Sequence, residues 1–158
     1  MGDFMKRLVL GFLALLAMAA PAAAVSVTNC PDDEATAGAR NIAEPWEKNT
    51  KTFSSGNVRV ALLDTGGEPV CCSMHLLVLN PGGGNDGGDE YRECHIINDH
   101  DASGFVGIDF TKLAASYDPK KGLLLTFPYS LYNDGNPGKT GVAKVRVNSK
   151  TGAVTVEK

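Results

Sequence analysis

The stretch that decides the fold is VRVALLD, residues 58–64, in which the larger apolar residues Val58, Val60 and Leu62 alternate with Arg59 and Ala61. Side chains of a β-strand point alternately to the two faces of a sheet, so this pattern predicts a strand with one buried face. The sequence TGGEP, residues 65–69, then predicts a turn, because glycine adopts positive φ without penalty and proline cannot donate to a ladder.

Two further strands are predicted immediately downstream, over residues 70–80 and 91–98. Four consecutive apolar residues, 76–79, predict that the first of them is buried on both faces. A plain hairpin centred on the glycine-rich loop 81–88 would set Cys94 opposite Leu77, about five residues from Cys72 and too far for a disulfide at roughly 3.3 Å per residue. Either the two strands lie in different sheets, therefore, or Cys94 bonds elsewhere.

The remainder of the chain repeats the same pattern of short strands and turns. Asp118 to Gly122 predicts a β-turn, Pro128 predicts that its strand is an edge or carries a bulge, and residues 112–116 fit one helical turn. The other predicted strands are 50–55, 105–110, 123–132, 142–147 and 153–156. The fold expected is all-β, an antiparallel β-sandwich or small barrel of about seven or eight short strands, stapled by disulfides.

The first residues predict export. Lys6 and Arg7 precede an apolar run at 8–20, and Ala22 to Ala24 fit a cleavage site, so residues 1–24 are predicted to be a signal peptide, with an uncleaved N-terminal anchor as the alternative. We therefore expect a periplasmic or secreted protein with one domain, residues 25–158. Its irregular N-terminal arm, residues 25–50, is expected to be pinned onto the sandwich by Trp46 and stapled by Cys30.

The charge balance argues against two classes of partner. The formal net charge is −3 at pH 7, which gives no electrostatic attraction to nucleic acid or to an anionic membrane. The partners considered are another exported protein or a component of the cell envelope.

The four cysteines of an exported domain are expected to form two disulfides. They are Cys30, Cys71, Cys72 and Cys94. Neighbouring residues of a strand point to opposite faces, so we expect Cys71 and Cys72 to bond to different partners, Cys30 and Cys94. A direct bond between Cys71 and Cys72 is the minority alternative.

Two clusters have the composition of metal sites. Cys71, Cys72 and His75, with Cys94 and His95, would suit zinc or copper, but their spacing matches no tetrahedral zinc pattern. The glycine- and aspartate-rich loop 82–90 has oxygen ligands for calcium, but a solvated loop is the favoured interpretation. No cofactor or metal is predicted as the main reading.

The function expected is binding rather than catalysis. A base and its orienting carboxylate are available among His95, His100, Asp99 and Asp101, but no nucleophile elbow, zinc-protease helix or phosphate loop is present. The main hypothesis is an exported non-enzymatic binding or accessory protein; a small metal-binding protein is second and a small hydrolase third. The candidate binding residues lie in two long loops and are Asn85, Asp86, Asp89, Glu90, Asn133, Asp134 and Asn136.

Overall fold

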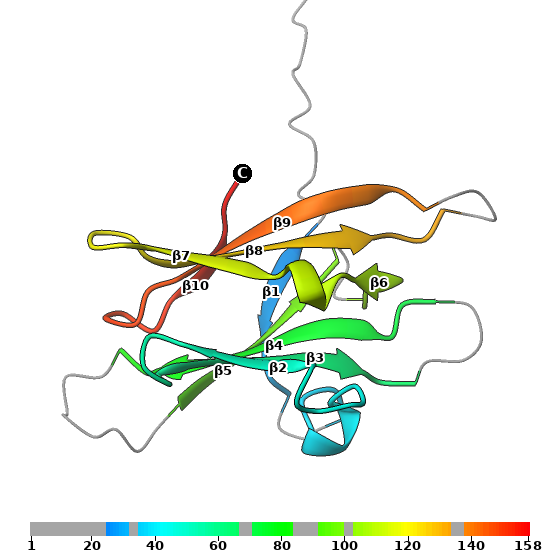
Figure 1. Ribbon diagram of the computed structural model, residues 1–158, viewed down its shortest axis with the longest axis horizontal. Helices are drawn as coiled ribbons and strands as arrows, with labels where there is room; N and C mark the ends of the chain where they lie inside the picture. Colours follow the sequence, from blue (N-terminus) through cyan, green and yellow to red (C-terminus); the bar gives the residue numbers. More distant parts are fainter. Residues whose placement is uncertain (1–24, 32–34, 67–70, 84–91, 100–102, 134–137) are drawn as a thin grey trace, which may run out of the picture.

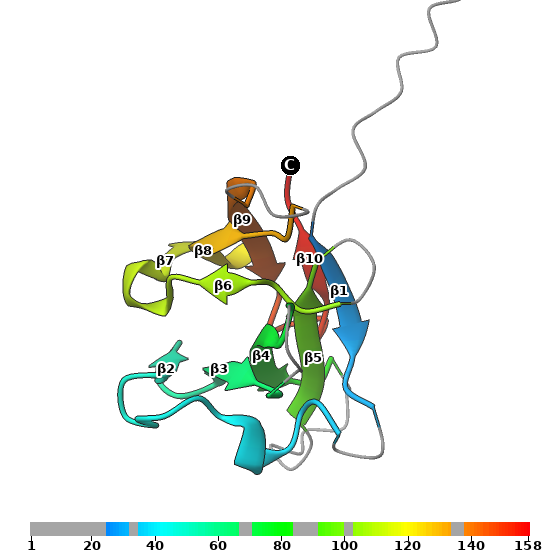
Figure 2. The same cartoon turned by 90° about the vertical axis from the view of Figure 1, so that its right-hand side faces the viewer.

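The protein is an antiparallel β-sandwich of two sheets, as Figures 1 and 2 show. The structure is a computed structural model that describes residues 25–31, 35–66, 71–83, 92–99, 103–133 and 138–158. The predicted fold class is therefore confirmed. The predicted signal peptide, residues 1–24, lies outside the described residues. Within the described ranges, no helix has the length and apolar character needed to cross a membrane.

The first sheet has five strands, and four of them follow one another in the chain. Its order is β1 (Ser26–Asn29), β5 (Arg92–Asn98), β4 (Met74–Pro81), β3 (Val58–Asp64) and β2 (Thr50–Phe53). The second sheet is built around the longest strand. Its order is β10 (Val154–Val156), β9 (Thr140–Val147), β8 (Gly122–Ser130) and β6 (Gly107–Ile108), and β7 (Ala114–Asp118) also pairs with β8.

The main core fills the space between the sheets. Val58, Val60 and Leu62 of β3 face it, as the alternation predicts, and Leu125 and Phe127 of β8 face it from the other sheet. Phe105 and Phe127 are also fully buried in this core and form an edge-to-face pair, with ring centroids 6.4 Å apart.

A second, smaller core covers the outer face of the first sheet. Leu63 and Leu77 form it together with Ala61 and Ile96, and residues of the N-terminal arm pack over them. Leu76 and Val78 meanwhile face the main core, so β4 is buried on both faces, as predicted. This outer core explains the unbroken apolar run in the sequence.

The N-terminal arm differs from its prediction in two respects. It begins with a strand, β1, which pairs with β5 and places Ser26 opposite Asn98. Trp46 does not pin the arm, because 48% of its surface is exposed. A bridge between Ile42 and Leu63 and the helical turn η1 (Ala39–Asn41) hold this part of the chain on the sheet instead.

The predicted disulfide pairing is wrong, although all four cysteines are paired. The bonds join Cys30 to Cys94 and Cys71 to Cys72. The strands β4 and β5 do form a hairpin, with Leu79 opposite Cys94, so the alternative in which Cys94 bonds elsewhere holds. Cys71 and Cys72 precede the start of β4, and the alternation of side chains along a strand therefore does not apply to them.

Strand β8 is internal, which corrects the prediction of an edge or a bulge at Pro128. Its register with β9 is continuous. On its other side, the pairing with β7 ends at Thr126 of β8 and the pairing with β6 begins at Tyr129 of β8. The carbonyl of Pro128 accepts from Asp109 on that side, so the missing N–H of the proline faces the break between two partner strands. The helical turn predicted at 112–116 is replaced by η2 (Phe110–Lys112) followed by β7.

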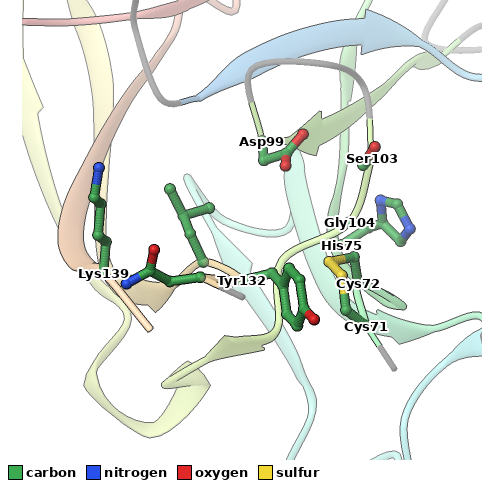
Figure 3. Close-up of a pocket in the computed structure, with 10 residues that line it drawn as sticks. Cys71, Cys72, His75, Asp99, Ser103, Gly104, Tyr132 and Lys139 are labelled. Atoms are coloured by element: carbon green, nitrogen blue, oxygen red, sulfur yellow. A yellow bond between two sulfur atoms is a disulfide. The ribbon is translucent and has the colours of Figure 1, made fainter. Parts of the chain in front are cut away.

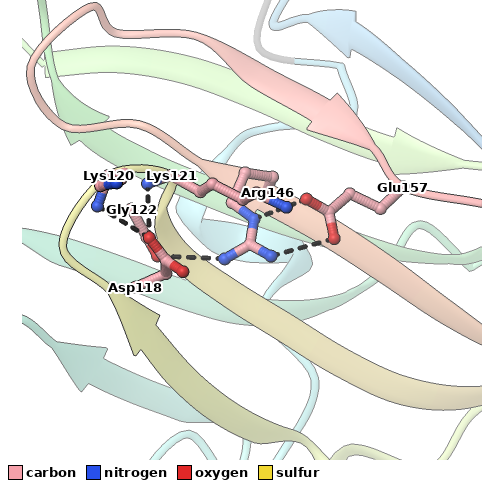
Figure 4. Close-up of polar contacts among 6 residues, drawn as sticks. All are labelled: Asp118, Lys120, Lys121, Gly122, Arg146 and Glu157. Atoms are coloured by element: carbon pink, nitrogen blue, oxygen red, sulfur yellow. Dashed lines mark hydrogen bonds and ion pairs between the residues drawn. The ribbon is translucent and has the colours of Figure 1, made fainter.

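The predicted turn at Asp118 is confirmed and belongs to a wider polar network (Figure 4). The carboxylate of Asp118 accepts from the backbone N–H groups of Lys120 and Lys121, at 2.7 and 2.9 Å. Arg146 of β9 donates to both carboxylate oxygens of Glu157 at 2.8 and 2.9 Å, and these bonds lower the pKa of Glu157. The network fixes the end of the chain beside the β7–β8 hairpin.

The two sides of the sandwich are closed differently. On one side β1 and β10 are in contact, as Figure 2 shows. On the other, the ammonium of Lys51 crosses from β2 to the second sheet and donates to the carbonyls of Phe110 and Leu113 at 2.9 and 3.1 Å. It also lies 5.0 Å from the centre of the Phe110 ring, a cation–π contact.

Candidate functional site

A cleft of about 720 Å³ opens at the end of the sandwich where β4 begins and β8 ends. Three separate segments meet there because they are the connections of that end. The lining residues are Cys71, Cys72, His75, Asp99, Ser103, Gly104, Leu131, Tyr132, Asn133 and Lys139. Figure 3 shows this cleft, with the sulfur atoms of the disulfide at its wall.

The Cys71–Cys72 disulfide is the most unusual feature of the cleft. Its two residues are adjacent in the chain, with Cα atoms 3.6 Å apart, and Cys72 has a φ of 84°. This left-handed conformation is rare for residues other than glycine. The disulfide ties both side chains into a small ring through the peptide bond that joins them, so neither side chain can change rotamer.

Gly104 packs against the backbone of this segment. A Cβ atom at Gly104 would lie 2.0 Å from the carbonyl oxygen of Cys72 and 2.9 Å from Nε2 of His75. Only glycine fits so close to another backbone. The close packing holds the turn at Cys72 in place against the loop that follows β5.

His75 is a lining residue of the cleft whose side chain is held by a neighbouring strand. Its side chain is buried, and its Nδ1 lies 2.7 Å from Oδ1 of Asn98, the residue opposite it on β5. The amide nitrogen of Asn98 donates to Thr28 of β1 at 2.9 Å, which leaves the amide oxygen to accept from the Nδ1–H of His75. The hydrogen bonds from His75 to Asn98 and from Asn98 to Thr28 thus link the three strands β4, β5 and β1.

The loop that follows β5 forms the second wall. The N–H of Asp99 donates to the carbonyl of Ser103 at 3.0 Å, and the hydroxyl of Ser26 donates to the carbonyl of Asp99. The backbones of Met74 and Phe105 then form a bridge that joins the loop to β4. These bonds place Asp99 and Ser103 on the lining of the cleft.

The third wall comes from the second sheet, beyond the end of β8. The N–H of Leu131 donates to the carbonyl of Lys139 at 2.8 Å, and Gly138 packs directly on the carbonyl of Leu131. Tyr132 follows, with 48% of its surface exposed. Figure 3 shows Tyr132, Asp99 and Ser103 among the side chains that line the cleft with the disulfide.

Of the predicted binding residues, the structure describes one. Asn133 lines the cleft. The other six residues lie outside the described part of the chain; they are Asn85, Asp86, Asp89, Glu90, Asp134 and Asn136. The loop that holds the first four begins at the far end of β4, where Gly83 packs on Thr151 of the β9–β10 turn.

The cysteine and histidine cluster is not assembled. Cys71, Cys72 and Cys94 are all in disulfides, and Cys94 faces the outer core whereas His75 lies at the cleft. No three His, Cys, Asp or Glu side chains within the described ranges are arranged to hold a metal ion. Of the residues considered for hydrolysis, Asp99 lines the cleft, His95 does not, and His100 and Asp101 lie outside the described residues.

His95 belongs to a buried polar pair at the far end of the molecule. Its Nε2 and the Oδ1 of Asn80 are both buried without a hydrogen-bond partner among the described residues, and the amide nitrogen of Asn80 donates to the carbonyl of Gly152 at 3.0 Å. Burial lowers the pKa of His95 below the usual 6.5, and this effect outweighs the opposing influence of Glu93 and of the backbone of Gly152.

The low pKa of His95 predicts loss of stability in mild acid. The unfolded chain binds the proton more readily than the folded chain. The contribution of neutral His95 to the free energy of unfolding is therefore complete above pH 6.5, and it falls as the pH drops from 6.5 toward the lower pKa of the folded state. The carboxyl of Asp109, whose pKa Lys112 and Thr111 hold at about 2, titrates below this window. His95→Gln is expected to flatten the pH dependence in urea unfolding; an unchanged slope would contradict this origin.

Sequence reasoning missed half of the lining residues of the cleft for identifiable reasons. Tyr132 extends the alternating run of β8, so it is predicted as a strand residue, although β8 ends at Ser130. Lys139 and Ser103 carry no local pattern at all. The adjacent pair Cys71-Cys72 was a signal that could have been used, because two neighbouring cysteines can close a ring on themselves. No protein-family model, no curated protein and no solved structure matches this chain.

Proposed function

We propose that this chain is an exported, non-enzymatic binding protein that takes a small polar molecule in the cleft at Cys71 and Cys72. The observation that carries the proposal is the joint presence of a fixed disulfide and a half-exposed Tyr132 in one cleft of about 720 Å³. Ligand sites are usually concave, of about 300 to 1,000 Å³, with apolar walls and a few placed polar groups.

The rigidity of the cleft supports binding. Ordering a flexible side chain on binding costs roughly 0.5 to 1.5 kcal/mol, and the two cysteines are already fixed by their ring. Gly104 is packed on Cys72, and His75 is held by Asn98, so the support beneath the disulfide is fixed as well. A ligand would therefore meet a wall that has already been ordered.

The arrangement of His75 favours binding over hydrolysis. Its Nδ1 bonds to the amide of Asn98 rather than to a carboxylate, and its Nε2 would lie 2.9 Å from a Cβ atom placed at Gly104. A general base needs a free nitrogen within hydrogen-bond reach of the group that it deprotonates. Among the described residues, no hydrogen bond joins His75 to Ser103.

Export is supported by two features. Both disulfides require an oxidising compartment to persist, and the first residues fit a signal peptide. A site whose wall is itself a disulfide is consistent with a protein that works in the periplasm or outside the cell.

The test is a binding screen that reports which residues respond. Isotope-labelled protein is titrated with pools of neutral sugars, amino acids, amines and nucleosides, and amide chemical shifts are followed. A ligand is expected to shift resonances of residues 71–75 and 131–133, and Tyr132→Ala is expected to weaken binding. Tyr117→Ala is the matched control, because Tyr117 is 66% exposed on β7 and lies outside the cleft. Shifts confined to other regions would overturn the proposal.

A further inference from the structure

We infer that the ligand of the cleft is a carbohydrate, bound with one pyranose ring over the Cys71–Cys72 disulfide. This inference rests on the proposed function and names the class of molecule that the same site takes. It follows from three properties of the lining: a fixed apolar platform, an adjoining aromatic ring, and a rim that both donates and accepts hydrogen bonds.

The platform is the disulfide itself. Sulfur is apolar and polarisable and makes favourable contacts with neighbouring groups. The ring that joins Cys71 and Cys72 presents two sulfur atoms on a surface that has no rotamer freedom to lose. A pyranose ring has one face formed largely by C–H groups, and burying this face against an apolar surface releases the water that covers both.

Tyr132 supplies the second apolar surface. Its ring is half-exposed and lines the same cleft, next to Leu131 in the chain. Tyrosine contributes a large flat apolar body together with a hydroxyl that remains available to water or ligand. The platform and the tyrosine thus offer contact to a ring-shaped ligand whose edges are polar.

The rim matches the chemistry of sugar hydroxyls. Each hydroxyl both donates and accepts, so a sugar requires both kinds of partner around its edge. Ser103 and Asn133 can do both, the ammonium of Lys139 donates, and Asp99 adds carboxylate oxygens to the lining.

Other ligand classes fit this lining less well. A phosphate or polyanion would need several cations, and Lys139 is the single basic side chain among the lining residues. A polyamine or another cation would need several carboxylates, and Asp99 supplies the only one among the described lining residues. A wholly apolar ligand would leave the buried polar groups of the rim without partners. A neutral polyhydroxylated ring requires neither several charged partners nor a wholly apolar lining.

The experiment is saturation-transfer NMR with the methyl glycosides of glucose, galactose, mannose and N-acetylglucosamine. Sorbitol is the matched control, because it carries hydroxyls like those of glucose but has no ring. At least one glycoside is expected to receive saturation at its ring C–H protons, and sorbitol is expected to receive none. Tyr132→Ala is expected to weaken binding of that glycoside by about tenfold, whereas Tyr117→Ala leaves it unchanged.

The platform is tested separately with the double variant Cys71→Ser, Cys72→Ser, whose folding is checked by its amide spectrum. It is expected to lose about as much affinity as Tyr132→Ala. If this variant fails to fold, the comparison of Tyr132→Ala with Tyr117→Ala still tests the inference. Glycoside binding that survives the loss of Tyr132, or equal saturation of sorbitol, would overturn the inference.

The two proposals fail in different ways. If no glycoside binds but an amine, amino acid or nucleoside of the screen shifts residues 71–75 and 131–133, the carbohydrate inference is wrong and the binding function stands. If no molecule of any class perturbs the cleft, both are wrong.

Discussion

Replacing Leu125 with alanine is expected to destabilise the fold by roughly 2 to 5 kcal/mol, the range for removing a large aliphatic side chain from a packed core. Leu125 is completely buried between the two sheets, at the centre of β8. The truncation removes apolar contacts and leaves a cavity in a core formed by strands that are paired on both sides. The measurement is the free energy of unfolding in urea.

The neighbouring residue provides the matched control. Leu124 has the same side chain on the same strand, but it points to the opposite face of the sheet and is only partly buried. Leu124→Ala is expected to cost about 1 kcal/mol or less. Equal losses at the two positions would mean that the outer face of the second sheet is also covered.

Removing the Cys30–Cys94 disulfide is expected to cost about 4 kcal/mol, in the variant Cys30→Ala, Cys94→Ala. The bond closes a loop with a sequence separation of 64, and the chain-entropy relation gives a cost of this size for such a loop. The bond also fastens the N-terminal arm over the outer core of Leu63 and Leu77. Urea unfolding of the double variant under oxidising conditions measures the loss.

The Cys71–Cys72 disulfide is expected to contribute much less to the free energy of unfolding than Cys30–Cys94. Cys71 and Cys72 have a sequence separation of 1, so their bond closes no loop of chain and removes little entropy from the unfolded state. The double variant Cys71→Ser, Cys72→Ser is therefore expected to retain most of its stability while losing ligand affinity. If the two double variants were destabilised equally, loop closure would not be the source of the effect.

The strands that were predicted correctly from the sequence have either one buried face or two buried faces. β3 and β8 alternate, and β4 is continuously apolar, because each faces a core. The two strands that were missed lack such a signal. β7 exposes Ala114 to Tyr117 without alternation, and β1 is a short polar strand whose residues are mostly half-buried. Edge strands of this kind are defined by their partners rather than by their own composition.

The candidate site was less predictable than the fold, because it is built from three connections far apart in the chain. The sequence identifies loops near 81–90 and 133–141, but not that they leave the sandwich at opposite ends. The disulfide pairing failed for a related reason. Its argument treated Cys71 and Cys72 as strand residues, whereas the strand begins at Met74 and the preceding residues are free to turn back on themselves.

The position of β1 bears on the order in which the molecule assembles during synthesis. Its partner β5 lies far downstream, and the hydrogen bond from Asn98 to Thr28 spans 70 residues of sequence. A ribosome delivers the N-terminus first, so β1 emerges long before β5 exists, while β2 to β5 can pair as successive neighbours. Three of the four residues of β1 are polar (Ser26, Thr28 and Asn29), and a polar segment that is still unpaired is less prone to aggregate than an apolar one.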